Sequence, residues 1–347
     1  MDTSTLSEIT RRFGVGQCRD VQPVRQGKVN ATFRVTTGSG TFILQRLKPP
    51  LNEKTVLDGL ALTEHLISKG FPAPRFLVSP KGEPFVKDGN DVYRLMTLLT
   101  GRTLDAMRDA GVGYAAGVLV GRLHRALADF HYTPVFRFEG LHDATFALSR
   151  LRDLVLSNPE KAEQVKPMVK RLAEEIPRLV LPAGLPKRCI HGDLKYTNIL
   201  FDDSGRAVGL LDFDTIMIST LPMELGDAFR SWCTRKYPVQ GVRDPGSGGG
   251  PFFDESMFRS GWLGYLSARP PVTHEEKEWI VTGIKAVLLE LGCRYLIDYF
   301  EDRYFAWDRK RFPDRPTHNL FRARRQLAVF DDVEAKEDRL RSLLEVD

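Results

Sequence analysis

The 347 residues of the chain are enough for about two domains, and its 42% hydrophobic and 27% charged residues exclude a disordered chain. Its net charge of +5 is interleaved with acidic residues and forms no basic stripe with aromatics, so no nucleic-acid partner is expected. The sequence shows no signal peptide, no apolar run long enough to cross a membrane and no paired cysteines, so we expect a cytoplasmic protein with no membrane partner.

The N-terminal part of the chain is predicted to contain strands and one helix. Residues 32–37 and 41–47 are rich in β-branched and aromatic side chains, and the glycines between them indicate a hairpin. Residues 54–69 carry apolar side chains at helical spacing, and Gly70 is expected to end this helix. Two more short strands are predicted at 75–78 and 92–98. Residues 1–98 are therefore expected to form a small β-rich lobe.

From residue 99 to residue 347 the patterns predict a larger, mostly helical lobe. Helices are expected at 113–130 and 279–300, where apolar residues recur along one face. A hairpin is predicted from residues 198–202 and 207–214, with an Asp-Ser-Gly turn between its strands. Residues 241–251 are too rich in glycine for a regular element, so a mobile loop is predicted there, with no assigned role.

The segment from Cys189 to Asp214 contains the residues that indicate chemistry. It has the spacing H-x-D-L-x-x-x-N, followed by a predicted strand that ends in an aspartate. Phosphoryl transfer depends mainly on positioning and on neutralising charge. Asp193 suits the acceptance of a hydroxyl proton, Asn198 and Asp212 suit Mg²⁺, and Lys195 suits a γ-phosphate. His191 is expected to hold the loop in place.

These motifs resemble those of the aminoglycoside phosphotransferase and choline kinase superfamily. The superfamily pattern H-x-D-x-x-x-x-N with a following I-D-x-D/E falls here on His191, Asp193, Asn198, Asp212 and Asp214. The resemblance implies an α+β, bilobal, protein-kinase-like fold. It also implies an ATP-dependent enzyme that uses Mg²⁺ and has a small-molecule alcohol as its acceptor.

The resemblance also implies a nucleotide site in the small lobe. Its nucleotide loop would include Asn30, and the connector that starts at Met96 is expected to contact the nucleotide. The next strand usually carries a phosphate-binding lysine, but here it has Gln45 and then Arg46. Strand alternation sends these two to opposite faces, and a bulge would be needed for Arg46 to serve. Glu64 either orients this cation or is an exposed helix carboxylate.

Within the superfamily, the segments 42–46, 212–217, 225–230, 291–305 and 319–326 look like those of the N-acetylhexosamine 1-kinases. This branch implies the anomeric hydroxyl of an N-acetylhexosamine as the acceptor. Lys28 stands where that branch has a histidine, and Glu224 where it has an aspartate. The candidate substrate contacts are Lys28, Asp214, Asp227 and Arg322.

Several alternatives remain open at this point. Asp227 and Arg230 either bind substrate or form a structural ion pair, and at most one of Arg322 and Arg324 should face the cleft, because they are two residues apart on a helix. Homoserine, choline and aminoglycosides are competing acceptors, and a nucleotide-binding pseudokinase is a different class of function. Nothing in the sequence sets the oligomeric state.

Overall fold

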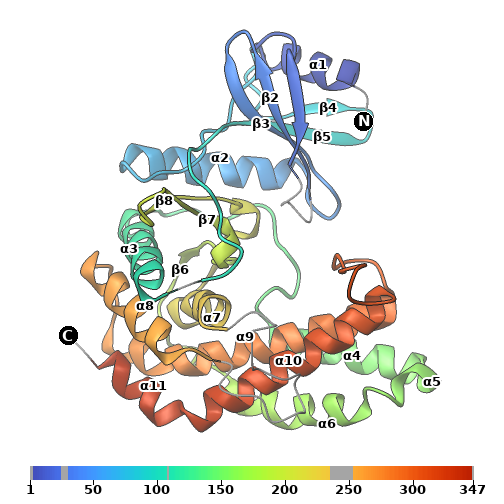
Figure 1. The fold of residues 1–347 in the computed structure, drawn as a ribbon, viewed down its shortest axis with the longest axis vertical. Coiled ribbons are helices and arrows are strands. Elements are labelled where there is room, and N and C mark those ends of the chain that lie inside the picture. Colours follow the sequence, from blue (N-terminus) through green and yellow to red (C-terminus); the bar gives the residue numbers. More distant parts are fainter. Residues whose placement is uncertain (1–2, 25–29, 108, 235–252, 346–347) are drawn as a thin grey trace.

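The computed structural model describes residues 3–24, 30–107, 109–234 and 253–345. Figure 1 shows a small lobe built around a β-sheet, drawn above a larger helical lobe. Lys28 and the whole glycine-rich segment 241–251 lie outside the described residues. The mixed α/β fold with a small sheet-containing lobe and a larger helical one is therefore confirmed, whereas the exact boundary at residues 98 and 99 stays a prediction.

The small lobe consists of one sheet and two helices. Its elements are α1 (Thr3–Arg12), β1 (Asp20–Pro23), β2 (Ala31–Thr37), β3 (Gly40–Arg46), α2 (Glu53–Ser68), β4 (Val86–Asp88) and β5 (Asp91–Thr97). The described strands pair antiparallel in the order β1-β2-β3-β5-β4. Helix α2 begins after Asn52, whose side chain accepts a hydrogen bond from the Lys54 amide (2.9 Å), and ends before Gly70, which has the expected positive φ of 71°.

The two helices cover opposite faces of this sheet. Leu44 and Leu95 are buried together with apolar residues of α1, whereas Met96 is buried together with Val56 of α2. Since side chains alternate along a strand, the α2 face of β3 also carries Gln45, and the α1 face carries Arg46. The sheet therefore presents Gln45 toward α2 and the large lobe.

The hairpin and helix α2 of the small lobe were predicted correctly, but helix α1 was not predicted and one predicted short strand is absent from the described residues. Residues 75–78 form no strand: only Phe76 makes an isolated bridge, to Met96. Strand β4 starts later, at Val86, and β1 was not predicted. Both are short edge strands with little apolar patterning, so their sequences give a weak signal.

The large lobe is formed mainly by helices, with two short antiparallel strand pairs beside the connector. Its helices are α3 (Ala110–Ala126), α4 (Ala144–Ser157), α5 (Pro159–Ala162), α6 (Lys166–Glu175), α7 (Leu221–Trp232), α8 (Glu255–Ser267), α9 (His274–Glu301), α10 (Arg315–Ala335) and α11 (Glu337–Leu344). Its strands are β6 (Lys187–Ile190), β7 (Ile199–Phe201), β8 (Ala207–Leu210) and β9 (Met217–Thr220). None of the helices described is long and apolar enough to span a membrane.

The two strand pairs position the residues of the predicted motif near the small lobe. Strand β7 pairs with β8 as predicted, and β6 pairs with β9. Strand β8 ends at Leu210, so Asp212 lies beyond the strand, in a turn that leads into the 3₁₀-helix η3 (Phe213–Thr215). The loop at residues 191–198, which we call the catalytic loop after the motif it carries, follows β6, and the turn with Asp212 follows β8. The two segments lie next to each other, because His191 contacts Leu211.

Candidate active site

The loop that follows β6 is shaped by a glycine. Gly192 has φ 77°, and a Cβ atom at this position would overlap the carbonyl oxygen of Thr215. Thr215 in turn donates a hydrogen bond to the carbonyl oxygen of His191 (2.9 Å). The ring of His191 contacts the carbonyl oxygen of Leu211 (3.0 Å). The catalytic loop and the loop with Asp212 are thus bonded to each other directly, and His191 has the structural role predicted for it.

Asp193 is held by two of the residues predicted to act with it. Lys195 forms an ion pair with its Oδ2 atom, and the Asn198 side-chain amide donates to the same oxygen (3.2 Å) and to the Asp193 carbonyl (2.9 Å). Burial would raise the pKa of Asp193, but the charge and hydrogen bond of Lys195 hold it below its usual value. Asp193 is therefore ionised at neutral pH, as a general base must be.

Asp212 has the geometry of a residue under functional constraint. Its φ of 66° and ψ of 64° lie in the left-handed region, which non-glycine residues seldom adopt. Its carboxylate is 43% exposed and lies 3.8 Å from Nζ of Lys195. Partial burial desolvates this carboxylate, and the nearby Asp214 adds negative charge, so the pKa of Asp212 is raised.

The oxygen atoms of Asp212 and Asn198 fit a hard divalent cation. The amide nitrogen of Asn198 is bonded to Asp193, which leaves its Oδ1 atom for another partner. The described residues contain no cluster of three or more acidic, histidine or cysteine side chains that would hold a metal by themselves. A Mg²⁺ ion here would take its other ligands from phosphates and water, as is common for this ion.

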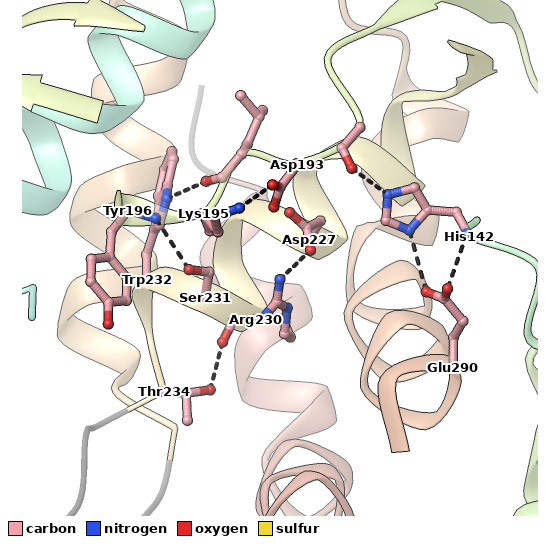
Figure 2. A network of polar contacts seen from close by, with 12 residues as sticks. His142, Asp193, Lys195, Tyr196, Asp227, Arg230, Ser231, Trp232, Thr234 and Glu290 are labelled. Atoms are coloured by element: carbon pink, nitrogen blue, oxygen red, sulfur yellow. Dashed lines mark hydrogen bonds and ion pairs between the residues drawn. The ribbon is translucent and has the colours of Figure 1, made fainter. Parts of the chain in front are cut away.

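The catalytic loop rests on two buried carboxylates that the motif search did not assign. Glu224 on α7 accepts hydrogen bonds from the amides of His191 (2.8 Å) and Gly192 (2.9 Å). Glu290 on α9 lies 3.4 Å from Nδ1 of His142, whose Nε2 contacts the Gly192 carbonyl (2.8 Å; Figure 2). These contacts hold both the amide and the carbonyl of Gly192, the residue that precedes Asp193. Glu224, noted in the sequence only as a departure, is thus a loop anchor.

The small lobe contributes an amide, a glutamine and a buried arginine. Asn30 donates to Asp214 (2.9 Å), as does Arg94 of β5 with two of its nitrogens, one of them at 2.9 Å. Arg94 also donates to Gln45 (2.8 Å). The sequence analysis missed Arg94, although an arginine inside the apolar strand V-Y-R-L-M was a usable signal. Asp214, a candidate substrate contact, is buried and bonded within the protein.

Three candidates of the small lobe lie differently from the expectation. Arg46 forms an ion pair with Asp91 (3.0 Å) on the sheet face away from Gln45, so no bulge turns it toward the phosphates. Glu64 is exposed on α2, and no described ion pair joins it to a cation of the sheet, which corrects its proposed orienting role. Met96 is 8% exposed, with its side chain in the apolar cluster under the sheet.

The remaining candidates for substrate contact are Asp227 and arginines of α7 and α10. Asp227 and Arg230 form an ion pair, as one of the two alternatives stated, and Figure 2 shows them beside Asp193 and Lys195. The Oδ2 atom of Asp227 is buried without a hydrogen-bond partner in the described part of the chain. Arg322 is half-buried, whereas Arg324 is exposed, so only one of the two turns inward, as predicted.

Comparisons of the sequence identify relatives in one family. The family model described as "Phosphotransferase enzyme family" matches residues 20–243. A homoserine kinase of Beijerinckia indica subsp. indica is 28% identical over 234 residues, which cover 66% of this chain and 69% of that protein. A homoserine kinase of Methylobacillus glycogenes is 24% identical over 303 residues, covering 86% and 85%. Closeness to N-acetylhexosamine 1-kinases is not shown by these relatives.

Solved structures show the same fold at low sequence identity. Amicoumacin kinase hAmiN, in complex with AMP-PNP, Ca²⁺ and Ami, has a TM-score of 0.65 and 14% identity, with 94% of this chain and 93% of that chain covered. A microcompartment-associated aminopropanol kinase has a TM-score of 0.63 and 15% identity, with 98% of each chain covered. The expectation of a kinase-like fold is confirmed by these neighbours.

Proposed function

The chain belongs to the phosphotransferase enzyme family and is an ATP-dependent kinase of small molecules, and we propose that its acceptor is the hydroxyl of a small amino acid of the homoserine type. The observation that carries this choice is a group of three arginines around Tyr295, namely Arg230, Arg322 and Arg325, which we call the arginine wall; of the three, Arg230 also acts on Asp193. A carboxylate on the acceptor would complement this charge.

Two members of the arginine wall interact electrostatically with the catalytic loop, Arg230 with Asp193 and Arg325 with Tyr196. The charge of Arg230 helps to lower the pKa of Asp193. Arg322 and Arg325 both act on Tyr295, and Arg325 also acts on Tyr196. Burial lowers the pKa of Arg322 and Arg325, because their charge is less well stabilised there than in water. A carboxylate on the acceptor would stabilise the charge of Arg322, whose described hydrogen bonds go to neutral oxygens.

The polar contacts of Arg322 leave its charge without a bonded carboxylate among the described residues. Its hydrogen bonds go to the neutral oxygens of Asn319 (2.9 Å) and Ala306 (2.7 Å), and its guanidinium lies 5.4 Å from the ring centre of Tyr295. The unpartnered Oδ2 of Asp227 would meet an acceptor ammonium group. Arginines and an acidic oxygen together suit a zwitterion.

Asp193 has one oxygen available for the acceptor. The described hydrogen bonds of its side chain, from Lys195 and Asn198, both reach Oδ2, so Oδ1 is the atom that we expect to accept the hydroxyl proton. Lys195 lies between Asp193 and Asp212, where its charge would stabilise the transferring phosphoryl group. Bound Mg²⁺ would neutralise phosphate charge, with Asn198 and Asp212 as its protein ligands.

Other acceptors complement this site less well. Aminoglycosides are polycations, which the arginine wall would repel, and choline has no anionic group for it to bind. An N-acetylhexosamine is neutral and would bring no carboxylate to Arg322. The sugar predicted from the sequence thus becomes the competing acceptor in the test, along with ethanolamine and choline.

The test is acceptor-dependent release of ADP from Mg-ATP, measured with homoserine and with each competing acceptor. The same assay is then run on two variants, Arg322→Gln and its matched neighbour Arg324→Gln. We expect turnover with homoserine, a KM for homoserine raised by about ten-fold in Arg322→Gln, and a change below about two-fold in Arg324→Gln. The KM for ATP should not change in either variant. Turnover with N-acetylglucosamine but not homoserine would reject this acceptor and restore the sugar.

A further inference from the structure

Arg94 is a buried cation at the centre of the small lobe. It is 2% exposed and lies on β5 directly opposite Gln45 of β3 in the strand register. Its guanidinium carbon is 5.5 Å from the ring centre of Phe76. A charge this deep is costly unless it is paired, so its position must be fixed by its partners.

The hydrogen bonds of Arg94 leave part of its donor capacity unused. Nε donates to Gln45 (2.8 Å), and one N–H of each terminal nitrogen donates to Asp214. A guanidinium has five N–H groups, so one N–H on each terminal nitrogen has no described acceptor. A second anion could therefore bind to Arg94 without breaking the pair with Asp214.

The surroundings of Arg94 place it beside the loop that carries Asp212. Asp214 follows the proposed Mg²⁺ ligand Asp212 by two residues, and the charge of Arg94 acts on the Asp212 carboxylate as well. Asn30 binds the same Asp214 carboxylate and also accepts a hydrogen bond from the Lys48 amide (3.2 Å). Arg94 thus enters the lobe interface from the sheet, at the point where a metal-bound phosphate would lie.

The register also places Arg34 of β2 on this sheet face, but Arg34 is exposed, lies opposite Ile43 and has no described contact with Asp214. The strand position expected to hold a lysine is occupied by the neutral Gln45, which is itself bonded to Thr32 (3.0 Å) and to Arg94. Arg46 is engaged by Asp91 on the opposite face. The buried cation on this sheet face therefore lies on β5 and not on β3, and its counter-ion is Asp214.

We propose that Arg94 is the residue of the small lobe that binds the phosphates of the nucleotide, with Asp214 as its fixed counter-ion and Gln45 as its orienting partner. This inference rests on the proposed use of a Mg²⁺-bound nucleotide. It assigns to Arg94 the contact that the sequence left open between Gln45 and Arg46.

The experiment measures the Kd of Mg-ADP by titration calorimetry, first for the unmodified protein and then for four variants. Arg94→Gln should weaken binding by at least about ten-fold, whereas Arg46→Gln should stay within about two-fold. Gln45→Lys combined with Arg94→Gln returns a cation to the β3 side of the same pair and should recover most of the affinity. Asp214→Asn keeps Arg94 and should lose less than about three-fold.

The pattern of affinities separates the possible failures. Equal losses in Arg94→Gln and Asp214→Asn, with no recovery by the added lysine, would overturn the inference and leave a structural ion pair. An equal loss in Arg46→Gln would overturn it too. Absence of nucleotide binding by the unmodified protein would reject the proposed function itself, before any variant is compared.

Loss of folding must be separated from loss of binding, because Arg94→Gln leaves Asp214 buried without its partner. Circular dichroism should therefore accompany each titration. If Arg94→Gln does not fold, the double variant Arg94→Gln with Asp214→Asn removes both charges and is expected to fold. It should bind Mg-ADP about ten-fold more weakly than the unmodified protein. Unweakened Mg-ADP binding by that folded variant would overturn the inference.

Discussion

His142 is a buried imidazole that carries a charge at neutral pH. Burial alone would lower its pKa, but the carboxylate of Glu290, 3.4 Å from Nδ1, outweighs burial and raises the pKa of His142 from 6.5 to about 9. The residue has a positive φ of 59°, and its ring joins Glu290 to the Gly192 carbonyl (Figure 2). Its protonated form is therefore a fixed support of the catalytic loop.

This raised pKa predicts a pH dependence of stability. The folded state binds the proton more tightly than the unfolded chain, so the stabilisation is fully present below pH 6.5 and is lost as the pH rises toward 9. Its upper limit is roughly 3 kcal/mol. Urea unfolding from pH 6 to pH 10 should show this loss, and His142→Gln should show a flatter profile. Parallel profiles for the two proteins would contradict the assignment.

The residues of the catalytic loop could be predicted from the sequence, but their supports could not. Asp193, Lys195 and Asn198 are close in sequence, and the structure brings their side chains together as the spacing indicates. Arg94 and His142 reach the same loops from distant segments, and nothing in their local sequence identifies the partner. Choosing between Gln45 and Arg46 also required the sheet faces to be known.

At the scale of elements, the active site depends on a close crossing of α7 and α9. A Cβ atom on Gly283 would overlap the carbonyl oxygen of Pro222, and one on Gly226 would lie 2.6 Å from the Gly283 carbonyl carbon. The backbones therefore touch where these glycines meet. Helix α7 carries Glu224 and Asp227, so this crossing fixes the depth at which both carboxylates sit under the catalytic loop.

The crossing predicts opposite effects for two glycines of the same helix. Gly283→Ala must push α7 and α9 apart and should lower the free energy of unfolding by about 2 kcal/mol or more. Gly292→Ala meets only side chains, at 3.7 and 3.8 Å, so its higher helix propensity should leave stability unchanged or raise it by up to about 1 kcal/mol. Thermal or urea unfolding measures both. Equal effects would show that the crossing is not the constraint.

Helix α9 was predicted from its apolar pattern, but its first residue and its crossing with α7 were not. The apolar stripe predicted a helix at 279–300, and the helix observed runs over His274–Glu301. It starts earlier because Thr273 and Glu276 form a capping box, with the Glu276 amide donating to the Thr273 hydroxyl (3.1 Å) and the Thr273 amide to Glu276 (2.9 Å). The crossing with α7 could not be predicted, because glycine on a helix also marks sites without close contact.

At the scale of the whole molecule, the two lobes meet through the carboxylate of Asp214, which follows Asp212 by two residues. Asp214 of the large lobe is bonded to Arg94 and Asn30, both from the small lobe. Figure 1 shows α2 lying between the sheet and the β7–β8 hairpin. Nucleotide phosphates bound at this junction would contact residues of both lobes. The bilobal order was predictable from the change in pattern near residue 99, but the bonds between the lobes were not.

The most direct test of the account is transfer of labelled γ-phosphate from Mg-ATP to homoserine, measured for the unmodified protein and for Asp193→Asn. The account predicts phosphohomoserine as the product, a rate lower by about 10²–10⁴-fold in Asp193→Asn, and unchanged Mg-ATP affinity in that variant. Removal of the divalent cation with EDTA should stop transfer in both. Label appearing on homoserine at the same rate in Asp193→Asn, or no label on any small alcohol despite Mg-ATP binding, would contradict it.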